Sequence, residues 1–340
     1  MDELNTWLIG GGLTIGAIFA IMVQHFRFCL VAGTSNLLLM KDYRQAMAFA
    51  TALLVAITGT QLLELTGLVA ISDSIYRNNT LDWFGTTAGG FLFGIGSALA
   101  GGCVTRTLVR TTEGSIHSLL ALLAFAIFAA VTQFGFLETL RIDLTNATAI
   151  SLTTDAGIAS IFSLSPWLVL AVVVTGLLAF IIKSWKRSPD ISMIIVGIII
   201  GLLVVSSWYV TGVLAQDDFD PIKPSAITMS GPLARFGYIL ISGRVSDLSF
   251  SILFVISTAV VSFMLALATR QFKITSPGKG MIKMSLLGGS LMGVGAIMAY
   301  GCNIGQGLSG ISTLSMESLF AVIGMVSGIT VVTKWMEKHT

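Results

Sequence analysis

Charged residues are scarce in this sequence. Lysine, arginine, aspartate and glutamate make up 11% of its 340 residues, whereas a soluble domain carries roughly a quarter. Cysteine and histidine occur only three times each, and no CxxC pattern is present. These shortages exclude a soluble domain, a disulfide framework and the usual zinc-binding motifs. The net charge of +2, with the basic residues spread through the loops, gives no indication of a nucleic-acid or acidic partner, and we expect no binding to nucleic acid.

Hydrophobic residues dominate instead. They make up 54% of the chain, its mean hydropathy is +0.90, and they form blocks of about 17 to 25 residues, the length that crosses a bilayer. We therefore predict an all-α polytopic membrane protein that forms a single integral membrane domain over residues 1–340. The predicted spans cover residues 6–23, 45–71, 84–101, 115–137, 166–183, 191–213, 249–269, 284–301 and 316–335.

The positive charges predict the orientation in the membrane. With the N-terminus outside, fourteen of the 19 lysines and arginines fall on the cytoplasmic side, where loops are enriched in these residues. We expect the N-terminus outside and the C-terminus in the cytoplasm.

The sequence contains an internal repeat. GGFLFGIGSALAGGC (89–103) aligns with GGSLMGVGAIMAYGC (288–302), and eight of the fifteen positions are identical. A weaker match relates Gly12 and Gly16 to Gly197 and Gly201. We predict two halves of opposite topology, about 1–137 and 191–340, linked by the span 166–183, an architecture common in transporters. For the four glycines of the weaker match, close helix packing is the preferred explanation.

Both repeats stop at a cysteine, and short apolar pieces follow. Such pieces come after Cys29, Cys103 and Cys302, and residues 224–236 form a fourth candidate. We interpret them as re-entrant half-helices, because broken backbone at membrane depth belongs where it lines a cavity or is buried in protein. A helix N-terminus attracts anions through its free N–H groups. A thiol beside it suits an anion with a sulfur-containing end.

The predicted substrate-binding residues are Cys29, Cys103, Cys302, Gly102, Gly301 and Asn303. The two glycines are expected to form tight turns and to allow close backbone approach. Asn303 and Gln306 are candidates for hydrogen bonds to the substrate, although Asn303 has helix capping as an equal alternative.

Several other polar residues can be interpreted either as functional or as structural. Arg106 and Arg110 would draw an anion inward, but the preferred interpretation treats them as ordinary cytoplasmic positive charges. Glu64 is a carboxylate inside a span and would serve proton coupling or lie near the outer interface. His25 and His117, near span ends, are expected to be interfacial or packed.

At these cysteines the chain resembles the YeeE/YedE family of bacterial membrane proteins, which is associated with sulfur transport. The resemblance covers essentially the whole chain and includes the segment HFRFCLVAG around Cys29. It implies nine transmembrane helices and four short embedded ones around an hourglass-like constriction, and it carries the functional cysteines over to Cys29, Cys103 and Cys302. It also implies thiosulfate passage through S–H···S contacts and a small cytosolic sulfur-carrier protein as partner. The second half departs from symmetry, because residues 209–215 contain no cysteine.

We predict a transporter that imports thiosulfate across the inner membrane, with the lipid bilayer as its surroundings. Another sulfur or selenium compound is an alternative substrate. A membrane thiol redox or soft-metal protein is an alternative class, disfavoured because 74 and 199 residues separate successive cysteines. No catalytic motif is present, so the sequence indicates no enzyme, cofactor or bound metal.

Overall fold

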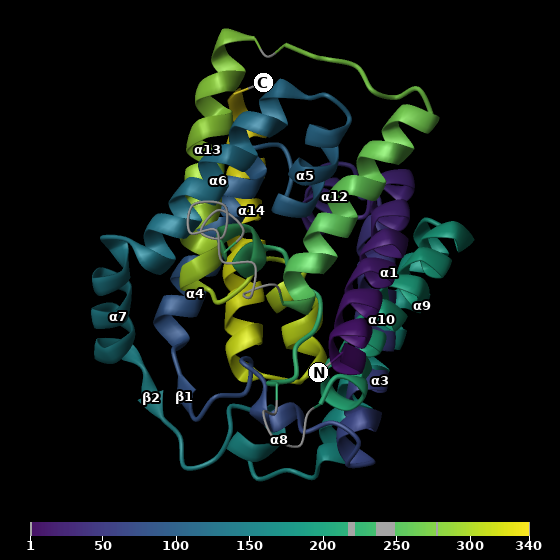
Figure 1. The fold of residues 1–340 in the computed structure, drawn as a ribbon, viewed down its shortest axis with the longest axis vertical. Helices are drawn as coiled ribbons and strands as arrows, with labels where there is room; N and C mark the ends of the chain where they lie inside the picture. The colour runs from purple at the N-terminus through teal and green to yellow at the C-terminus, as the bar shows by residue number, and fades with distance from the viewer. Residues whose placement is uncertain (1, 217–221, 236–248, 277, 340) are drawn as a thin grey trace.

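The computed structural model describes residues 2–216, 222–235, 249–276 and 278–339, which form a bundle of long helices (Figure 1). Nine helical segments of this described part are long and apolar enough to cross a membrane, and each overlaps a predicted span. The prediction of an all-α polytopic membrane protein is thereby confirmed. The long helices are α1 (Asp2–Phe26), α3 (Arg44–Leu65), α4 (Trp83–Leu99), α6 (Ile116–Phe134), α9 (Pro166–Arg187), α10 (Ile191–Tyr209), α12 (Phe250–Ala268), α13 (Lys279–Met298) and α14 (Met316–His339).

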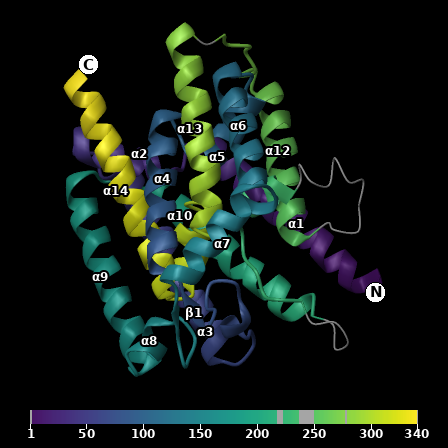
Figure 2. The same cartoon turned by 90° about the vertical axis from the view of Figure 1, so that its left-hand side faces the viewer.

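The two ends of the bundle are named for the predicted orientation. The inner end, at the top of Figure 1, holds the end of α14 and the connection between α12 and α13. The outer half, toward the bottom, holds four elements that the sequence pattern did not predict. They are α7 (Leu137–Thr148), α8 (Ile158–Ile161) and a short antiparallel pair of strands, β1 (Thr80–Leu81) and β2 (Ile150–Ser151), and Figure 2 shows α7 and α8 from a second side.

One predicted boundary is wrong. The span 45–71 is too long, because α3 ends at Leu65. Gly67 has a φ of 70°, and the N–H of Leu68 bonds to the carbonyl of Leu63 (3.0 Å). This left-handed turn ends the helix. The chain then passes through a 3-10 turn, η1 (Ile71–Asp73), at the outer end.

Glycines set the spacing between the helices. Gly12 and Gly16 lie against α12, where a Cβ would meet the backbone carbonyls of Phe250 and Phe254. On the opposite pair of helices, Gly197 and Gly201 lie in the same way against α3. The interpretation of these four residues as packing glycines is confirmed, since any side chain there would push the helices apart.

The same contacts recur in both halves. α1 packs on α12 as α10 packs on α3, and α4 packs on α14 as α13 packs on α6. α4 and α13 are themselves adjacent and antiparallel, because Gly89 lies against Ala299 while Gly96 lies against Gly288. Exchanging the halves maps each pair onto the other, which is the arrangement that an inverted repeat requires. The division into repeats stays a prediction that these contacts support.

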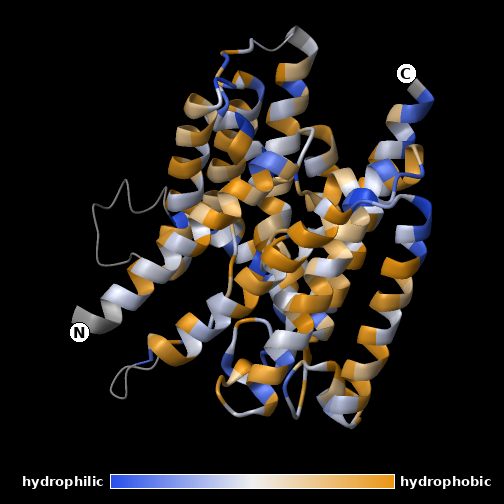
Figure 3. Cartoon of the chain, turned by 90° about the vertical axis from the view of Figure 1, so that its right-hand side faces the viewer, coloured by the Kyte–Doolittle hydropathy of each residue, from blue (hydrophilic) through white to orange (hydrophobic). Residues whose placement is uncertain are grey.

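The outside of the bundle is apolar. Figure 3 shows hydrophobic residues along the long helices, with hydrophilic residues gathered near the C-terminus. On α9, Trp167, Val172 and Ile182 are all more than half exposed. An apolar exterior of this kind fits hydrocarbon surroundings.

Candidate functional site

Two short helices begin at cysteines inside the bundle. α2 (Leu30–Leu39) follows Cys29 directly, and α5 (Val104–Thr112) follows Cys103 directly, which confirms these two predicted short helices. The Sγ atoms of the two cysteines lie 3.5 Å apart, and the residues are only 2% and 1% exposed. The structure thus brings together two predicted site residues that are distant in sequence. A separation of 74 residues along the sequence therefore does not keep these two thiols apart.

A shared helix cap turns the chain into the cysteine segments. α4 ends with Gly101 at a φ of 74°, and the N–H of Gly102 bonds to a carbonyl one turn back (2.9 Å). α13 ends alike, with Tyr300 at a φ of 53° and the Gly301 N–H bonded one turn back (2.8 Å). A left-handed residue followed by this backward bond is the Schellman ending of a helix. This ending explains why the apolar runs of α4 and α13 stop just before Cys103 and Cys302.

The prediction for Gly102 and Gly301 therefore needs correction. The tight turn is made one residue earlier in each half, by Gly101 and Tyr300. The N–H groups of Gly102 and Gly301 are engaged in the caps. Gly102 instead provides room, because the side chain of Arg106 lies 3.2 Å from the place where its Cβ would be.

Cys302 has a different setting from the other two cysteines. It is fully buried, and its carbonyl accepts a hydrogen bond from the N–H of Gln306 (2.7 Å). The following helical piece, the π-helix η4 (Gly305–Gly310), begins three residues further on, so this thiol lies near the start of a short helix but not directly at it. Its three glycines disfavour a regular α-helix.

The side-chain amides of Asn303 and Gln306 differ in their hydrogen bonds. Both side-chain amide atoms of Asn303 are buried without a hydrogen-bond partner among the described residues, so this residue does not cap η4. Gln306 uses both of its amide atoms within the protein, donating to the carbonyl of Ala299 (2.8 Å) and accepting from the hydroxyl of Ser318 (2.5 Å). An orphaned buried amide is costly unless something else binds it. Asn303 is therefore a candidate ligand-binding group. Gln306 instead stabilises the helix break by bonding to Ala299 and Ser318.

Tyr76 is a neighbour of this segment that the sequence did not reveal. Its side chain is buried, and its hydroxyl lies 3.6 Å from the place of a Cβ on Gly305. Thr228 lies closer to that place, at 2.6 Å. Tyr76 comes from an irregular loop without any periodic pattern, so no sequence signal could have placed it here.

Thr228 belongs to the fourth predicted re-entrant segment, 224–236. Residues 222–228 have no regular secondary structure and residues 230–235 are helical, whereas residue 236 lies outside the described residues. The hydroxyl of Ser309 in η4 donates to the carbonyl of Ile227 (2.7 Å). The described part of the segment therefore packs on the Cys302 segment inside the protein.

An aromatic pair connects the two cysteine regions. Phe28, the neighbour of Cys29, stacks on Phe49 with the ring centres 5.6 Å apart. The ring of Phe49 also lies 3.3 Å from the place of a Cβ on Gly307 in η4. Cys29, Cys103 and Cys302 belong to one continuous buried cluster.

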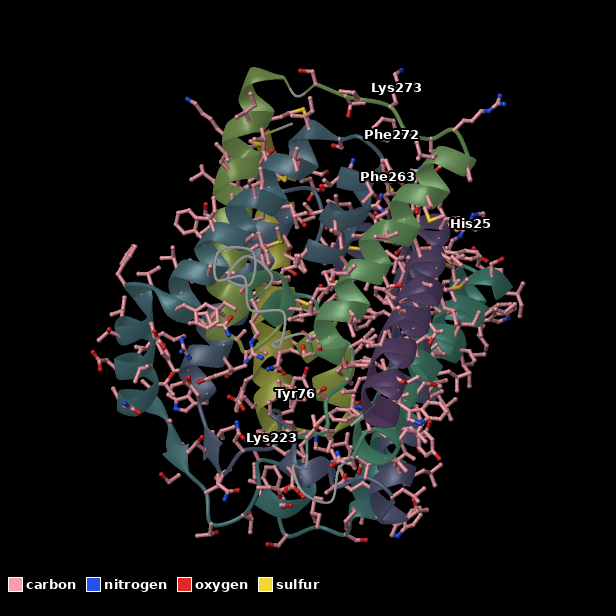
Figure 4. All side chains as sticks on the ribbon, in the orientation of Figure 1. His25, Tyr76, Lys223, Phe263, Phe272 and Lys273 are labelled. Carbon is pink, nitrogen blue, oxygen red and sulfur yellow. The ribbon has the colours of Figure 1, made fainter. Side chains whose placement is uncertain are left out.

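A cavity opens toward each end of the bundle. The inner cavity, of about 530 Å³, reaches Cys29 and Gly102 and is also lined by Arg106 and by Thr333 near the end of α14. The outer cavity, of about 720 Å³, is lined by polar residues that include Arg77, Asn79 and Lys223. In Figure 4, Lys223 and Tyr76 lie in the lower half of the molecule, whereas His25 and Lys273 lie in the upper half.

Glu64 is held in an ion pair at the outer end. Its carboxylate accepts a hydrogen bond from the Arg77 guanidinium (2.5 Å), and the same guanidinium is paired with Asp155. Arg77 has a side chain that is only 9% exposed. The pairing joins the end of α3 to two later loops, the one that holds Arg77 and the one that holds Asp155, which favours an interfacial position of Glu64 over proton coupling.

Replacing Arg77 with methionine is expected to destabilise the protein by about 3 kcal/mol, because it leaves the carboxylates of Glu64 and Asp155 without their partner. The unfolding temperature of the purified protein in detergent should fall clearly. Lys223→Met, which changes an exposed cation at the same end, is the matched control and should leave it unchanged. Adding Glu64→Gln to Arg77→Met should recover part of the loss. Equal unfolding temperatures for Arg77→Met and the parent protein would contradict this role.

The two histidines are packed or interfacial, as predicted. The His25 ring meets Phe26 edge-on (4.7 Å), and His117 shares a hydrogen bond with the hydroxyl of Ser285. Arg110 donates to the carbonyl of Gly101 (3.3 Å), while Arg106 lines the inner cavity. No group of three or more metal-binding side chains occurs in the part of the chain that the structure describes.

Comparison with known proteins now adds to this geometry. A family model described as sulphur transport matches residues 25–331 and so includes all three cysteines. The chain belongs to this sulphur transport family. Among its relatives, the thiosulfate transporter TsuA of Escherichia coli (strain K12) is 28% identical over 342 residues, covering 95% of this chain and 93% of the relative.

A second relative is the thiosulfate transporter TsuA of Spirochaeta thermophila (strain ATCC 700085 / DSM 6578 / Z-1203). It is 29% identical over 335 residues, covering 94% of this chain and 97% of the relative. Family membership, named transporters as relatives and the membrane-spanning helices identify the chain as a multi-pass membrane transport protein and not an enzyme.

Proposed function

We propose that this protein imports thiosulfate into the cytoplasm along a path lined by Cys302, Cys103 and Cys29. The observation that carries the proposal is the contact between two buried thiols, 3.5 Å apart, each at the start of a short helix. The substrate itself comes from the named function of the two relatives.

The helix starts supply attraction for an anion. Neither α2 nor α5 has a side-chain cap, and the first N–H groups of a helix have no partner within it. Two helix N-termini therefore meet at the sulfur pair, and each carries a partial positive charge. An anion is stabilised there without a lysine or arginine at the centre of the bilayer, where such a charge is costly.

The thiols supply selectivity for sulfur. A thiol is a weak donor and a weak acceptor, so it offers little to the oxygens of sulfate but matches the soft terminal sulfur of thiosulfate. On the outer side, the unpartnered amide of Asn303 next to Cys302 is suited to hold the substrate oxygens. Tyr76 and Thr228 lie beside Gly305, two residues further along the same segment.

The route that follows runs from the outer cavity to Cys302 and Asn303, then to Cys103 and Cys29, and out through the inner cavity. The proposal includes the predicted orientation in the inner membrane, with the N-terminus outside, the C-terminus in the cytoplasm and the two inverted halves on either side of the thiols. A small cytosolic sulfur-carrier protein, suggested by the family resemblance, would receive the substrate at the inner end.

The 3.5 Å thiol contact also favours a second candidate, a membrane dithiol protein that exchanges electrons. Such a protein would cycle between thiols and disulfide during its function. The transporter requires the thiols to stay reduced.

Uptake of sulfur-labelled thiosulfate into lipid vesicles that contain only the purified protein tests the proposal. We expect uptake above that of empty vesicles, with competition by unlabelled thiosulfate and little competition by sulfate or selenite. Absence of uptake by the intact protein would refute thiosulfate transport. Stronger competition by selenite than by thiosulfate would assign the path to selenium compounds.

A further inference from the structure

Three arginines surround a small cavity at the inner end, beyond the thiols. Arg27, Arg106 and Arg110 line it, together with Gln24 and Glu113, and its volume is about 150 Å³. None of the three arginines forms an ion pair within the described residues, where such pairs involve only Arg44 and Arg77. With one carboxylate against three guanidinium groups, the cavity has an excess of positive charge.

This cavity adjoins the path proposed for the substrate. Arg106 lines both the arginine cavity and the larger inner cavity that reaches Cys29. The side chain of Arg106 lies over Gly102, where the missing Cβ leaves it space. Arg106 is therefore shared by the cavity that reaches the thiols and the cavity of the arginines.

A buried side-chain amide at the end of α1 that has no partner in the described part of the chain also points to a ligand. Arg27 adopts a φ of 54°, a left-handed conformation that is uncommon for residues other than glycine, at the turn between α1 and α2. Gln24, one helical turn before it, has both side-chain amide atoms buried without a hydrogen-bond partner among the described residues. An amide in this state next to guanidinium groups that form no ion pair among the described residues fits an oxygen-rich anion, because the amide nitrogen can donate to it.

We infer that Arg27, Arg106, Arg110 and Gln24 form a second anion site, which binds the oxygens of a tetrahedral sulfur oxyanion on the inner side of the thiols. Guanidinium groups bind such oxygens through paired, charge-assisted hydrogen bonds. A bound dianion would also relieve the repulsion between the three arginines. The inference rests on the proposed function only for the identity of the transported anion.

The two sites would then recognise opposite ends of the substrate. The thiols contact the terminal sulfur, and the arginines contact the three oxygens, which sulfate also presents. The arginine site should therefore accept sulfate, which the thiol path discriminates against. Sulfate from the cytoplasmic side should slow thiosulfate uptake by occupying this site.

Binding of sulfur-labelled sulfate to the purified full-length protein in detergent tests this site. The Arg27→Gln/Arg106→Gln double variant should weaken sulfate binding by about tenfold or more, because it removes two charge-assisted contacts. Lys273→Gln, which changes an exposed cation at the same end, is the matched control and should bind as the parent protein does. Unchanged sulfate binding in the double variant, or no binding by the parent protein, would overturn the inference.

A second variant distinguishes loss of sulfate binding from loss of folding. Arg27→Lys/Arg106→Lys keeps both charges but loses the forked geometry, so we expect weaker sulfate binding than in the parent at an unchanged unfolding temperature. Parent-like binding by this lysine variant would overturn the assignment of paired contacts. Thiosulfate uptake measured in parallel separates the two proposals. Sulfate binding that depends on the arginines, without any thiosulfate uptake, would retain this site and refute the proposed function.

Discussion

Cys103→Ala is expected to lower the initial rate of thiosulfate uptake by about 10- to 100-fold, because losing a buried polar contact costs roughly 1–3 kcal/mol and each 1.4 kcal/mol is tenfold in rate. Cys29→Ala should have a similar effect, since the two sulfur atoms are in contact. Cys302→Ala should also lower the rate of uptake, because Cys302 lies on the outer part of the same path. The measurement is uptake into vesicles at equal amounts of folded protein.

The control for this series is Ser184→Ala. Ser184 is also a small, fully buried polar residue, but it lies on the peripheral helix α9. Its replacement should leave uptake unchanged. Full uptake by a protein with all three cysteines replaced would reduce the thiols to packing residues and contradict the proposed path.

Oxidising the protein with diamide is expected to abolish uptake completely and reversibly. Cys29 and Cys103 each lose one hydrogen as their sulfur atoms join, and diamide takes up both hydrogens to become the hydrazine. Closing the 3.5 Å contact to a bond needs only a small movement. The disulfide removes both thiols from the path and ties the starts of α2 and α5 together.

Counting free thiols in the denatured protein checks this result. Of the three cysteines, only Cys302 should remain free after oxidation, and dithiothreitol should restore both the thiols and the uptake. Cys29→Ser is the control that cannot form the cross-link. Three free thiols after diamide treatment would show that Cys29 and Cys103 are not neighbours. Faster turnover of the oxidised protein would favour the dithiol candidate over the transporter.

The membrane spans could be predicted from the sequence because their cause is local. A helix needs about 20 apolar residues to cross a bilayer whatever its neighbours are, so the blocks of hydrophobic residues were sufficient. The glycines that mediate helix packing were equally readable, since their four-residue spacing places them on one face. The boundary error after Leu65 arose because a single turn at Gly67 ends α3 while the apolar pattern continues.

The positions of the helix breaks were predicted, but the residues that make the turns were not. The repeated Gly-Cys pattern indicated that α4 and α13 stop near Cys103 and Cys302. It did not indicate that Gly101 and Tyr300 make the turns, because a tyrosine in a left-handed conformation has no local signal. Nor did it distinguish Asn303, whose amide has no partner among the described residues, from Gln306, whose amide is occupied.

The sequence by itself determined the membrane class, the number and places of the spans and the cysteines at the helix breaks. These follow from short-range hydropathy and from helix propensity. Only the tertiary structure decided that Cys29 touches Cys103, that Arg77 joins Glu64 to Asp155, and that three arginines surround one cavity. Such contacts join residues far apart along the chain, and they depend on the packing of whole helices, which no local pattern encodes.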